Sequence, residues 1–356
     1  MSLKKEKFPS INGLRAISII LVILHHLSLK EQIFLPILKK YQWTKPVIDI
    51  LQDGQFGVNV FFVISGFLIT SIMLNEEANT GTVSFKNFFA RRVLRIFPAY
   101  YFLLLVYFVL QNLGYIHLTL LSWITALTYT KNFIWVSFDW YTAHSWSLSV
   151  EEHFYLFWPL VFVYGKSFRK EFAIFLIIIV PFLRVIDHFY QLDWIDEQNI
   201  FTRIDSISTG VVFALYRTQI LDFIKYKWSL TLYISSFILL TIRLFPSWAS
   251  KFHLEAIFIP LGVSYGTIAN FAIAFFMMYV VFGPQKILFK VLNTKVLNYI
   301  GLLSYSLYLW QQIFISGSDF WIGKYPQNIV FLSLIALFSY YIIEKPFLRF
   351  KSKIFF

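Results

Sequence analysis

The sequence predicts an all-α integral membrane protein, a bundle of about ten transmembrane helices with both termini cytoplasmic. Three observations support this prediction. Of the 356 residues, 58% are hydrophobic and only 14% are charged, whereas soluble chains carry about 25% charged residues. Apolar windows of about 20 residues recur along the chain. Lysine and arginine concentrate on alternate loops, as they do on the cytoplasmic side of membrane proteins.

Ten apolar windows are long enough to form helices that cross a bilayer. Their approximate bounds are 13–29, 57–74, 93–114, 149–165, 172–190, 203–219, 229–245, 256–282, 297–316 and 327–344. With the N-terminus inside, about 20 lysines and arginines lie on cytoplasmic loops, against roughly seven on the opposite loops. Because little room remains for a separate soluble domain, we expect residues 1–356 to form a single membrane domain.

Two segments fit the pattern of simple spans poorly. Residues 115–135 are apolar but contain Lys131, and residues 253–283 are long and contain Pro260 and Gly262. Irregular backbone is tolerated at membrane depth where it lines a cavity. Each segment is therefore either re-entrant or an additional span.

Composition excludes several kinds of chemistry. The chain contains no cysteine, which excludes disulfides, thiolate metal sites and a cysteine acyl-enzyme, and we expect no metal. The net charge of +12 is explained by topology in a membrane chain, so we expect no nucleic-acid partner. The first apolar run is followed by His25, His26 and Lys30 rather than by small residues, and we expect this helix to be retained.

The first helix carries the clearest functional candidates, since ionisable residues inside a membrane are costly. Arg15 and His26 are eleven residues apart, which places them within roughly 20° of one helix face and about 16 Å apart along the axis. His25 lies off that face. We expect Arg15 near the cytoplasmic interface and His26 deeper, towards the outer half. The alternative is that Arg15 reaches the headgroups and His26 is a satisfied bundle histidine.

The second and third windows carry small residues and arginines. Ser65 and Gly66 are expected to allow close helix packing. Arg91, Arg92 and Arg95 are spaced so that they can converge at the cytoplasmic start of the third helix. Guanidinium groups suit the phosphates of a molecule such as coenzyme A. The alternative is an ordinary positive-inside anchor.

The densest polar cluster is the segment DWYTAHSWSLSVEEHFYLFWP, which the charge pattern assigns to the outer side. Glutamate and histidine together allow general acid–base chemistry. Ser149 and Glu152 have the spacing of a helix capping box. That interpretation leaves Glu151 and His144 free for chemistry.

The later windows are interpreted as mainly architectural. Arg203 and Asp205 begin the helix near 203–219, and a structural ion pair between them is the simplest interpretation. The segment LSYSLYLWQQ is rich in tyrosine and tryptophan, as interfacial belts are.

Seven segments in order resemble the acyltransferase-3 family of membrane O-acyltransferases. They are GLRAISIILVILHH, GVNVFFVISGFLI, RRVLRIFPAY, HSWSLSVEEHFY, RIDSISTG, SYSLYLW and EKPF, and they extend from about residue 10 to residue 348. The resemblance implies a multi-pass enzyme of the cell membrane, among membrane lipids, that transfers acyl groups. The donor implied is cytoplasmic acetyl-CoA, and the acceptor is a surface or lipid-linked glycan such as O-antigen, capsule or exopolysaccharide.

The resemblance also implies which residues form the site. The arginine and histidine of the first helix, the cytoplasmic arginines and the glutamate of the W-x-L-x-x-E pattern correspond here to Arg15, His26, Arg91, Arg92, Arg95 and Glu151. Three positions depart from the family pattern: Asn59 for aspartate, His153 for glutamine and Gln311 for histidine. The chain resembles the stand-alone form of the family, without an appended hydrolase-like domain.

These observations lead to one mechanistic hypothesis. Three arginines (Arg91, Arg92, Arg95) hold the phosphates of the donor, and Arg15 positions it. His26 acts as general base towards a sugar hydroxyl or briefly carries the acyl group, while Glu151 orients or charge-balances His26 from the outer side. The alternatives are a transporter or flippase of a lipid-linked glycan, and an acyltransferase with another donor such as succinyl-CoA.

Overall fold

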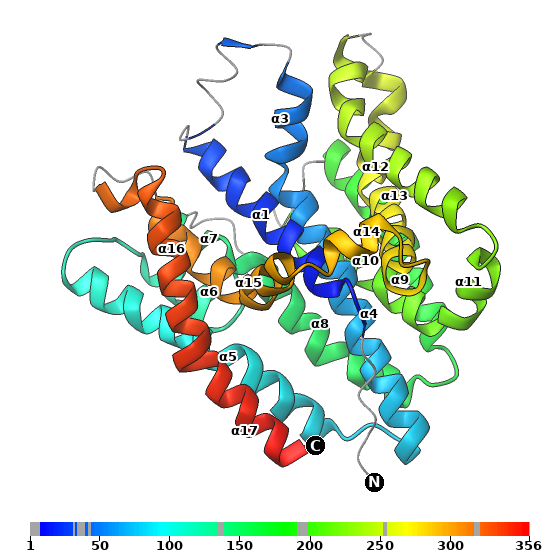
Figure 1. Ribbon diagram of the computed structural model, residues 1–356, viewed down its shortest axis with the longest axis horizontal. Coiled ribbons are helices and arrows are strands. Elements are labelled where there is room, and N and C mark those ends of the chain that lie inside the picture. Colours follow the sequence, from blue (N-terminus) through cyan, green and yellow to red (C-terminus); the bar gives the residue numbers. More distant parts are fainter. Residues whose placement is uncertain are drawn as a thin grey trace.

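The part of the chain that the computed structural model describes consists of helices joined by turns and loops, and no strand occurs in that part (Figure 1). It comprises residues 8–30, 33, 40–41, 44–133, 139–190, 192, 198–251, 255–316 and 321–355, with side chains described except at 46, 243–265 and 351–355. Each of the ten apolar windows coincides with a helix. The prediction of an all-helical protein is therefore confirmed.

Long helices cover the apolar windows, and short helices connect them. The long ones are α1 (Ile11–Leu29), α4 (Gly54–Thr80), α5 (Phe85–Asn112), α8 (Ser145–Tyr164), α9 (Arg169–Tyr190), α10 (Ile200–Leu215), α12 (Trp228–Lys251), α13 (Glu255–Phe282), α15 (Lys295–Phe314) and α16 (Gln327–Phe338), which continues through the π-helical η3 (Ser339–Glu344) into α17 (Lys345–Phe355). The short ones are α3 (Lys45–Leu51), α6 (Leu120–Leu127), α7 (Trp140–Ala143), α11 (Arg217–Ile224), α14 (Ile287–Leu292) and the 3-10 helix η2 (Trp321–Gly323).

Five helices of the described chain are long and apolar enough to cross a membrane. They are Ile11–Leu29, Gly54–Thr80, Phe85–Asn112, Arg169–Tyr190 and Gln327–Phe350. Large apolar side chains on their outer faces, such as Phe108 of α5 and Phe182 of α9, are exposed, as contact with lipid requires. The protein is thus a multi-pass membrane protein, while the number of ten spans and the cytoplasmic termini remain predictions.

The two segments that fit poorly as spans have different structures. Within its described residues, 115–133, the first segment forms the short helix α6 of eight residues, which are too few to cross a bilayer. Residues 255–282 form one unbroken helix, α13. No break therefore occurs near Pro260, Gly262 or Gly266.

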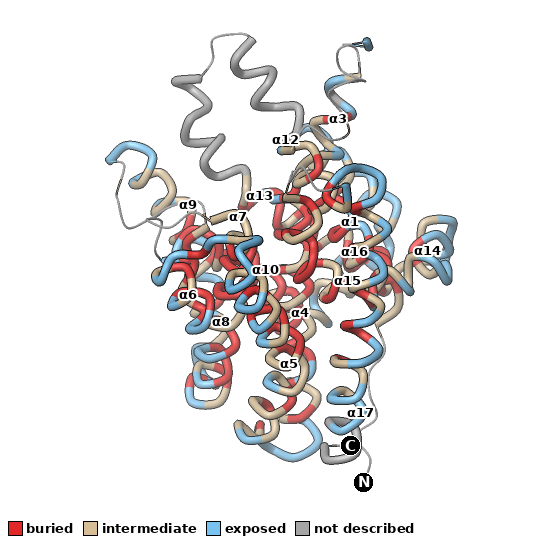
Figure 2. Tube along the Cα trace, turned by 90° about the vertical axis from the view of Figure 1, so that its left-hand side faces the viewer, coloured by how far each residue is buried: buried red, intermediate tan, exposed pale blue. Residues whose placement is uncertain are grey.

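Helix α4 lies at the centre of the bundle, where buried residues are concentrated (Figure 2). It packs against α1 and α10. A Cβ atom at Gly66 would overlap the carbonyl oxygen of Ile207, and one at Gly210 would overlap that of Val63. The prediction that Gly66 serves close packing is confirmed.

Helices α1 and α15 are in equally close contact. A Cβ atom at Gly301 of α15 would overlap the backbone of Asn12 in α1. Because the two helices pack along their length, the C-terminal part of α15 lies beside the histidines of α1. This contact positions the candidate site.

Candidate active site

An inner cavity of about 150 Å³ lies among α1, α4, α5, α8 and α15. Four of the six residues predicted for the site line this cavity, namely Arg15, Arg92, Arg95 and Glu151. Ser65 and Tyr155 line it as well. Residues from the first, third and fourth apolar windows are thus brought to one place. Such a convergence of arginines in a membrane bundle is costly unless it is used.

The guanidinium groups in the inner cavity have hydrogen-bond donors available to a ligand. Within the described chain, Arg15, Arg92 and Arg95 form no ion pair, and the buried Nε of Arg92 has no hydrogen-bond partner. The Arg92 guanidinium lies 5.5 Å from the centre of the Tyr155 ring. Free N–H donors in a fixed fork suit phosphate and carboxylate groups.

Arg91 is separated from the other two arginines of its helix. Its Nη2 donates to Oε2 of Glu76 at 2.6 Å, and both side chains are about nine-tenths buried. Oε1 of Glu76 also accepts from the backbone N–H of Ser84 at 3.0 Å. Arg91 therefore ties the end of α4 to the start of α5 and does not line the inner cavity.

Glu151 lies in the inner cavity and does not hydrogen-bond to His26. Its Oε1 accepts from Ser65 Oγ at 2.7 Å, and its carboxylate interacts electrostatically with Arg15. The expected role of orienting His26 from the outer side is therefore not the one that this geometry favours. The reason is that α8 begins at Ser145, so Glu151 is six residues, or about 9 Å, further along the helix.

The same helix start removes the capping box. Ser149 lies inside α8 and donates to the carbonyl oxygen of Ser145 at 2.9 Å. His144, not Ser149, is the N-cap residue. The pairing of Ser149 with Glu152 at a helix start is therefore wrong.

An outer cavity of about 140 Å³ lies beyond the inner one and contains His26. Nδ1 of His26 is 3.1 Å from Oε1 of Gln311, and its Nε2 is 3.4 Å from Nε2 of Gln312. The indole of Trp140 packs against the imidazole edge to face, with ring centres 5.6 Å apart. His26 is thus held by side chains on its two sides while it borders open space.

His25 also lines the outer cavity, but it has a structural partner. Its Nδ1 lies 2.7 Å from the carbonyl oxygen of Gln52, and Ser28 Oγ donates to Gln52 Oε1 at 2.6 Å. These contacts hold the loop between α3 and α4 against α1. His25 therefore has a role that His26 lacks.

His144 is a third histidine of the outer cavity; the sequence left it free for chemistry beside Glu151, but the mechanistic hypothesis gave it no role. It is 3% exposed, and neither ring nitrogen has a hydrogen-bond partner in the described chain. Its position directly before the SWSLSVEE segment was the available signal. A buried, unpartnered imidazole at a cavity is a candidate for contact with substrate.

Val58 and Tyr308 line both cavities. The Tyr308 hydroxyl donates to the carbonyl oxygen of His144 at 2.8 Å and lies 2.6 Å from Ser147 Oγ. The two cavities are therefore neighbours, and a fixed tyrosine ring lies where they meet.

Arg203 and Asp205 do not pair with each other, so the expected ion pair is wrong. Asp205 accepts from Arg184 at 2.7 Å and from Thr267 at 2.6 Å. Arg203 instead donates to Gln55 and lies 5.7 Å from the centre of the Trp146 ring. Because Gln55 and Trp146 line the outer cavity, Arg203 supports its wall.

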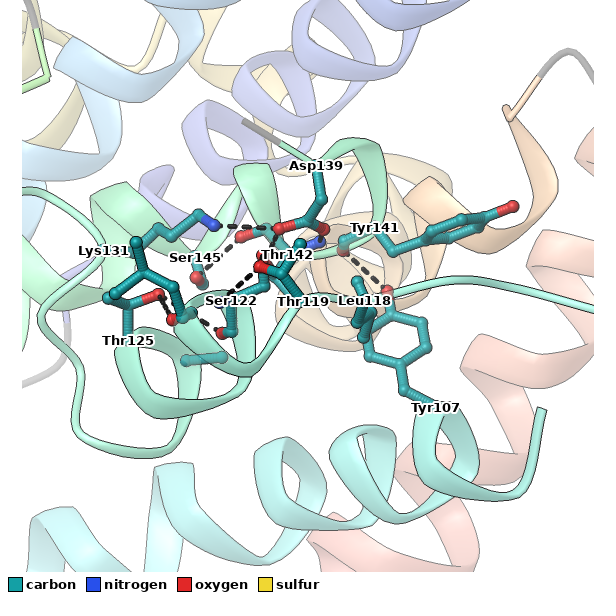
Figure 3. Close-up of polar contacts among 12 residues, drawn as sticks. Tyr107, Leu118, Thr119, Ser122, Thr125, Lys131, Asp139, Tyr141, Thr142 and Ser145 are labelled. Carbon is teal, nitrogen blue, oxygen red and sulfur yellow. Dashed lines mark hydrogen bonds and ion pairs between the residues drawn. The ribbon is translucent and has the colours of Figure 1, made fainter. Parts of the chain in front are cut away.

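A polar cluster that includes Lys131, Asp139 and Thr142 lies at the start of α7, the short helix that carries Trp140 (Figure 3). Asp139 caps α7 by accepting from the Thr142 N–H at 2.6 Å, and Lys131 Nζ donates to it at 2.8 Å. Burial opposes ionisation of Asp139, but these hydrogen bonds outweigh it and hold the pKa of the carboxyl below its usual range. In the described chain, no group of histidine, aspartate and glutamate side chains has the arrangement of a metal site.

Comparison with known proteins agrees with the motif order. SACOL0978 of Staphylococcus aureus strain COL is 28% identical over 384 residues, which cover 97% of this chain and 58% of that protein. O-acetyltransferase OatA of Staphylococcus aureus strain NCTC 8325 is 29% identical over 372 residues, which cover 95% of this chain and 57% of OatA. The chain thus spans less than two thirds of the length of these relatives. No solved structure matches it.

A family model described as an acyltransferase domain matches residues 8–343, almost the whole chain. Both cavities are built from residues within this match. The chain therefore belongs to the acyltransferase-3 family and carries its acyltransferase domain.

Proposed function

We propose that the protein is an O-acetyltransferase of the cell membrane that moves an acetyl group from cytoplasmic acetyl-CoA to a hydroxyl group of an extracytoplasmic glycan. The observation that carries this proposal is the pair of adjoining cavities. Unpaired arginines line the inner one, His26 lines the outer one, and Tyr308 borders both. The name of the relative OatA supports acetyl as the group transferred.

The inner cavity is the proposed donor site. Arg92 and Arg95 bind phosphate groups of acetyl-CoA through their free donors, because charge-assisted hydrogen bonds from guanidinium to phosphate are strong. Arg15, which lies on the same helix as His26 and nearer the inner end, positions the thioester. Glu151 holds Arg15 in place electrostatically. Arg91 serves the α4–α5 junction.

The distribution of basic residues supports a cytoplasmic donor side. The end of α4 and the start of α9 meet through Glu77, which pairs with Lys166 and Arg169. The basic helix α17 packs against α5, which also carries the arginines. Positive charge is therefore concentrated at the end of the bundle where the donor arginines lie, as the positive-inside rule requires for a cytoplasmic face.

The outer cavity is the proposed acceptor site. Trp140 and Trp146 offer aromatic surface, and Gln55 and Gln312 offer amide groups. Apolar walls with a few directed polar groups are typical of small-molecule sites, and this combination suits a sugar ring with its hydroxyl groups.

His26 performs the proton transfer in this proposal. Its imidazole takes the proton of the acceptor hydroxyl while the hydroxyl oxygen attacks the thioester carbonyl carbon. The carbon–sulfur bond then breaks, and the imidazolium returns the proton to the departing thiolate, which completes general base and general acid catalysis. In the alternative covalent route, the imidazole attacks the thioester first and passes the acetyl group to the hydroxyl.

Binding of acetyl-CoA to the purified protein tests the donor site. Acetyl-CoA is expected to raise the melting temperature of the wild type, because a ligand that binds only the folded state stabilises it. Arg92→Glu and Arg95→Glu are expected to abolish this rise. Lys166→Glu reverses a charge at an exposed residue outside the inner cavity and serves as the control.

The outcomes separate the alternatives. Equal stabilisation of the wild type and both arginine variants would return the arginines to the role of topology anchors. No stabilisation of the wild type would favour a transporter of lipid-linked glycan. Mass spectrometry of the modified glycan distinguishes acetyl from succinyl.

A further inference from the structure

Two consecutive glutamines of α15 hold His26 from both ring nitrogens. Oε1 of Gln311 lies 3.1 Å from Nδ1, and Nε2 of Gln312 lies 3.4 Å from Nε2. Gln311 is 0% exposed and Gln312 is 1% exposed. Helix α15 packs closely against α1, with its tightest approach at Gly301, and this packing places both glutamines beside His26.

The contact with Gln311 determines which ring nitrogen of His26 carries the proton. An amide oxygen only accepts hydrogen bonds, so Nδ1 must be the donor. In a neutral imidazole the other nitrogen then carries the lone pair. Nε2 of His26 is therefore the basic atom.

The contact with Gln312 differs in length. At 3.4 Å it lies near the long end of the range for hydrogen bonds, and Oε1 of Gln312 is buried without a partner in the described chain. Gln312 lines the outer cavity together with His26. A hydroxyl oxygen in the cavity beside these two nitrogens, at hydrogen-bond distance from both, can accept from the amide N–H of Gln312 while its own proton points to Nε2 of His26.

We propose that Gln311 fixes the reactive tautomer of His26 and that Gln312 positions the acceptor hydroxyl. This inference rests on the proposed function. The hydroxyl oxygen accepts from Gln312, gives its proton to Nε2 of His26 and attacks the thioester carbon. The proton then passes to the thiolate as the carbon–sulfur bond breaks. Gln311 is a positioning residue in this scheme, whereas Gln312 touches the acceptor.

The surroundings of His26 make the role of Gln311 testable by charge. His25 and His144 line the same cavity, and Lys30 lies 3.9 Å from the centre of the Trp140 ring that packs on His26. In the described chain, no carboxylate lines this cavity. A carboxylate at position 311 would therefore be a new negative charge beside the imidazole, and it would favour the imidazolium form.

The test uses the purified protein, acetyl-CoA and envelope polysaccharide from a strain that lacks the gene. Gln311→Met keeps the side-chain length but removes the acceptor, and kcat is expected to fall about tenfold or more with the KM for both substrates little changed. Gln311→Glu restores an acceptor oxygen. It is expected to recover much of kcat and to move the acid limb of the pH–rate profile to higher pH, because a protonated His26 cannot act as base.

Gln312→Met is expected to raise the apparent KM for polysaccharide, with little effect on the KM for acetyl-CoA. Gln111→Met is the matched control, because Gln111 accepts from Leu118 and Trp123 and lines neither cavity. It is expected to keep wild-type kinetic constants.

The inference is overturned if both variants at position 311 keep the kcat and the pH profile of the wild type, or if Gln312→Met leaves the polysaccharide KM unchanged. Equal losses in both kinetic constants at both positions would indicate a structural role and would also overturn it. A wild type that binds acetyl-CoA but transfers no acetyl to polysaccharide would instead contradict the proposed function, so the two failures are distinguishable.

Discussion

Tyr308 is expected to keep the thioester in the inner cavity away from water in the outer one. Its ring borders both cavities, and its hydroxyl is anchored to the carbonyl oxygen of His144 at 2.8 Å. Tyr308→Ala removes the ring and joins the cavities, whereas Tyr308→Phe keeps the ring and removes only the hydroxyl. Comparison of the two variants therefore distinguishes the effect of the ring as a barrier to water from the effect of the hydrogen bond.

The energies of the two changes differ. Tyr308→Phe removes one of two side-chain donors to the carbonyl oxygen of His144, since Ser147 Oγ also donates to it, and the lost hydrogen bond costs about 0.5–1.5 kcal/mol of stability. Tyr308→Ala removes a large buried side chain, which costs about 3–5 kcal/mol. Each variant is therefore first checked for stabilisation by acetyl-CoA, so that a loss of fold is not taken for a loss of barrier.

Release of CoA thiol from acetyl-CoA without acceptor measures the leak. Because the chain contains no cysteine, a thiol reagent reports CoA with no signal from the protein itself. We expect Tyr308→Ala to raise acceptor-independent hydrolysis about tenfold, equivalent to a barrier lower by about 1.4 kcal/mol, and to lower transfer to polysaccharide. Tyr308→Phe is expected to stay near the wild type. Wild-type hydrolysis by a folded Tyr308→Ala variant would refute the barrier role.

Three further predictions concern individual side chains. His26→Ala is expected to lower acetate on the cell glycan about 10²–10⁴-fold. His25→Ala is expected to lose only the stability of one hydrogen bond, about 0.5–1.5 kcal/mol. Loss of acetylation in His25→Ala but not in His26→Ala, at equal protein level, would reverse our assignment. Glu76→Gln leaves Arg91 buried without its charge partner, so the free energy of unfolding is expected to fall by about 3–5 kcal/mol, while acetyl-CoA still raises the melting temperature; unchanged stability would contradict the structural role of this pair. The pKa of Asp139 is lowered in the folded protein, so its ionised form stabilises the fold above the pKa of the unfolded chain, about 4, and this stabilisation is lost as pH falls through the pKa of the folded protein. The difference in melting temperature between the wild type and Asp139→Asn should therefore be full at neutral pH and vanish in acid. A difference that does not change with pH would contradict this role.

Much of the fold followed from the sequence because the membrane imposes simple rules. Length and hydrophobicity identify helices when every backbone group must be satisfied within its own segment, and every predicted window is helical. The close contact at Gly66 was predictable for the same reason, since small residues allow helices to approach in a bilayer. The continuity of α13 was not predictable, because Pro260 and the nearby glycines break helices only when tertiary contacts do not compensate.

The site was predicted in part. The helical period put Arg15 and His26 on one face of α1 and His25 off it. In the structure Arg15 lines the inner cavity and both histidines line the outer one, so the period alone does not single out His26. Arg91 stays out of the inner cavity because it pairs with Glu76, a residue of another helix. No spacing rule within one helix specifies such a partner. The position of Glu151 depended on where α8 begins, and helix ends are the least certain part of any sequence interpretation.

Gln311 and Tyr308 show a further limit. Each becomes a candidate only through a contact between segments far apart in the chain: Gln311 of α15 contacts His26 of α1, and Tyr308 of α15 donates to the carbonyl oxygen of His144 before α8. Gln311 differs from the histidine that the family resemblance implies at this position, so the resemblance assigns it no catalytic role. Its hydrogen bond to His26 gives it a role that residue type alone did not indicate.

Transfer across a sealed membrane tests the central claim most directly. Proteoliposomes are loaded with radiolabelled acetyl-CoA, and envelope polysaccharide from a strain that lacks the gene is supplied only outside. For molecules whose inner cavity faces the lumen, we predict labelled acetate on the external polysaccharide and free CoA in the lumen. We predict neither product with His26→Ala. Label that appears only when acetyl-CoA and polysaccharide are on the same side would contradict a path through the two cavities.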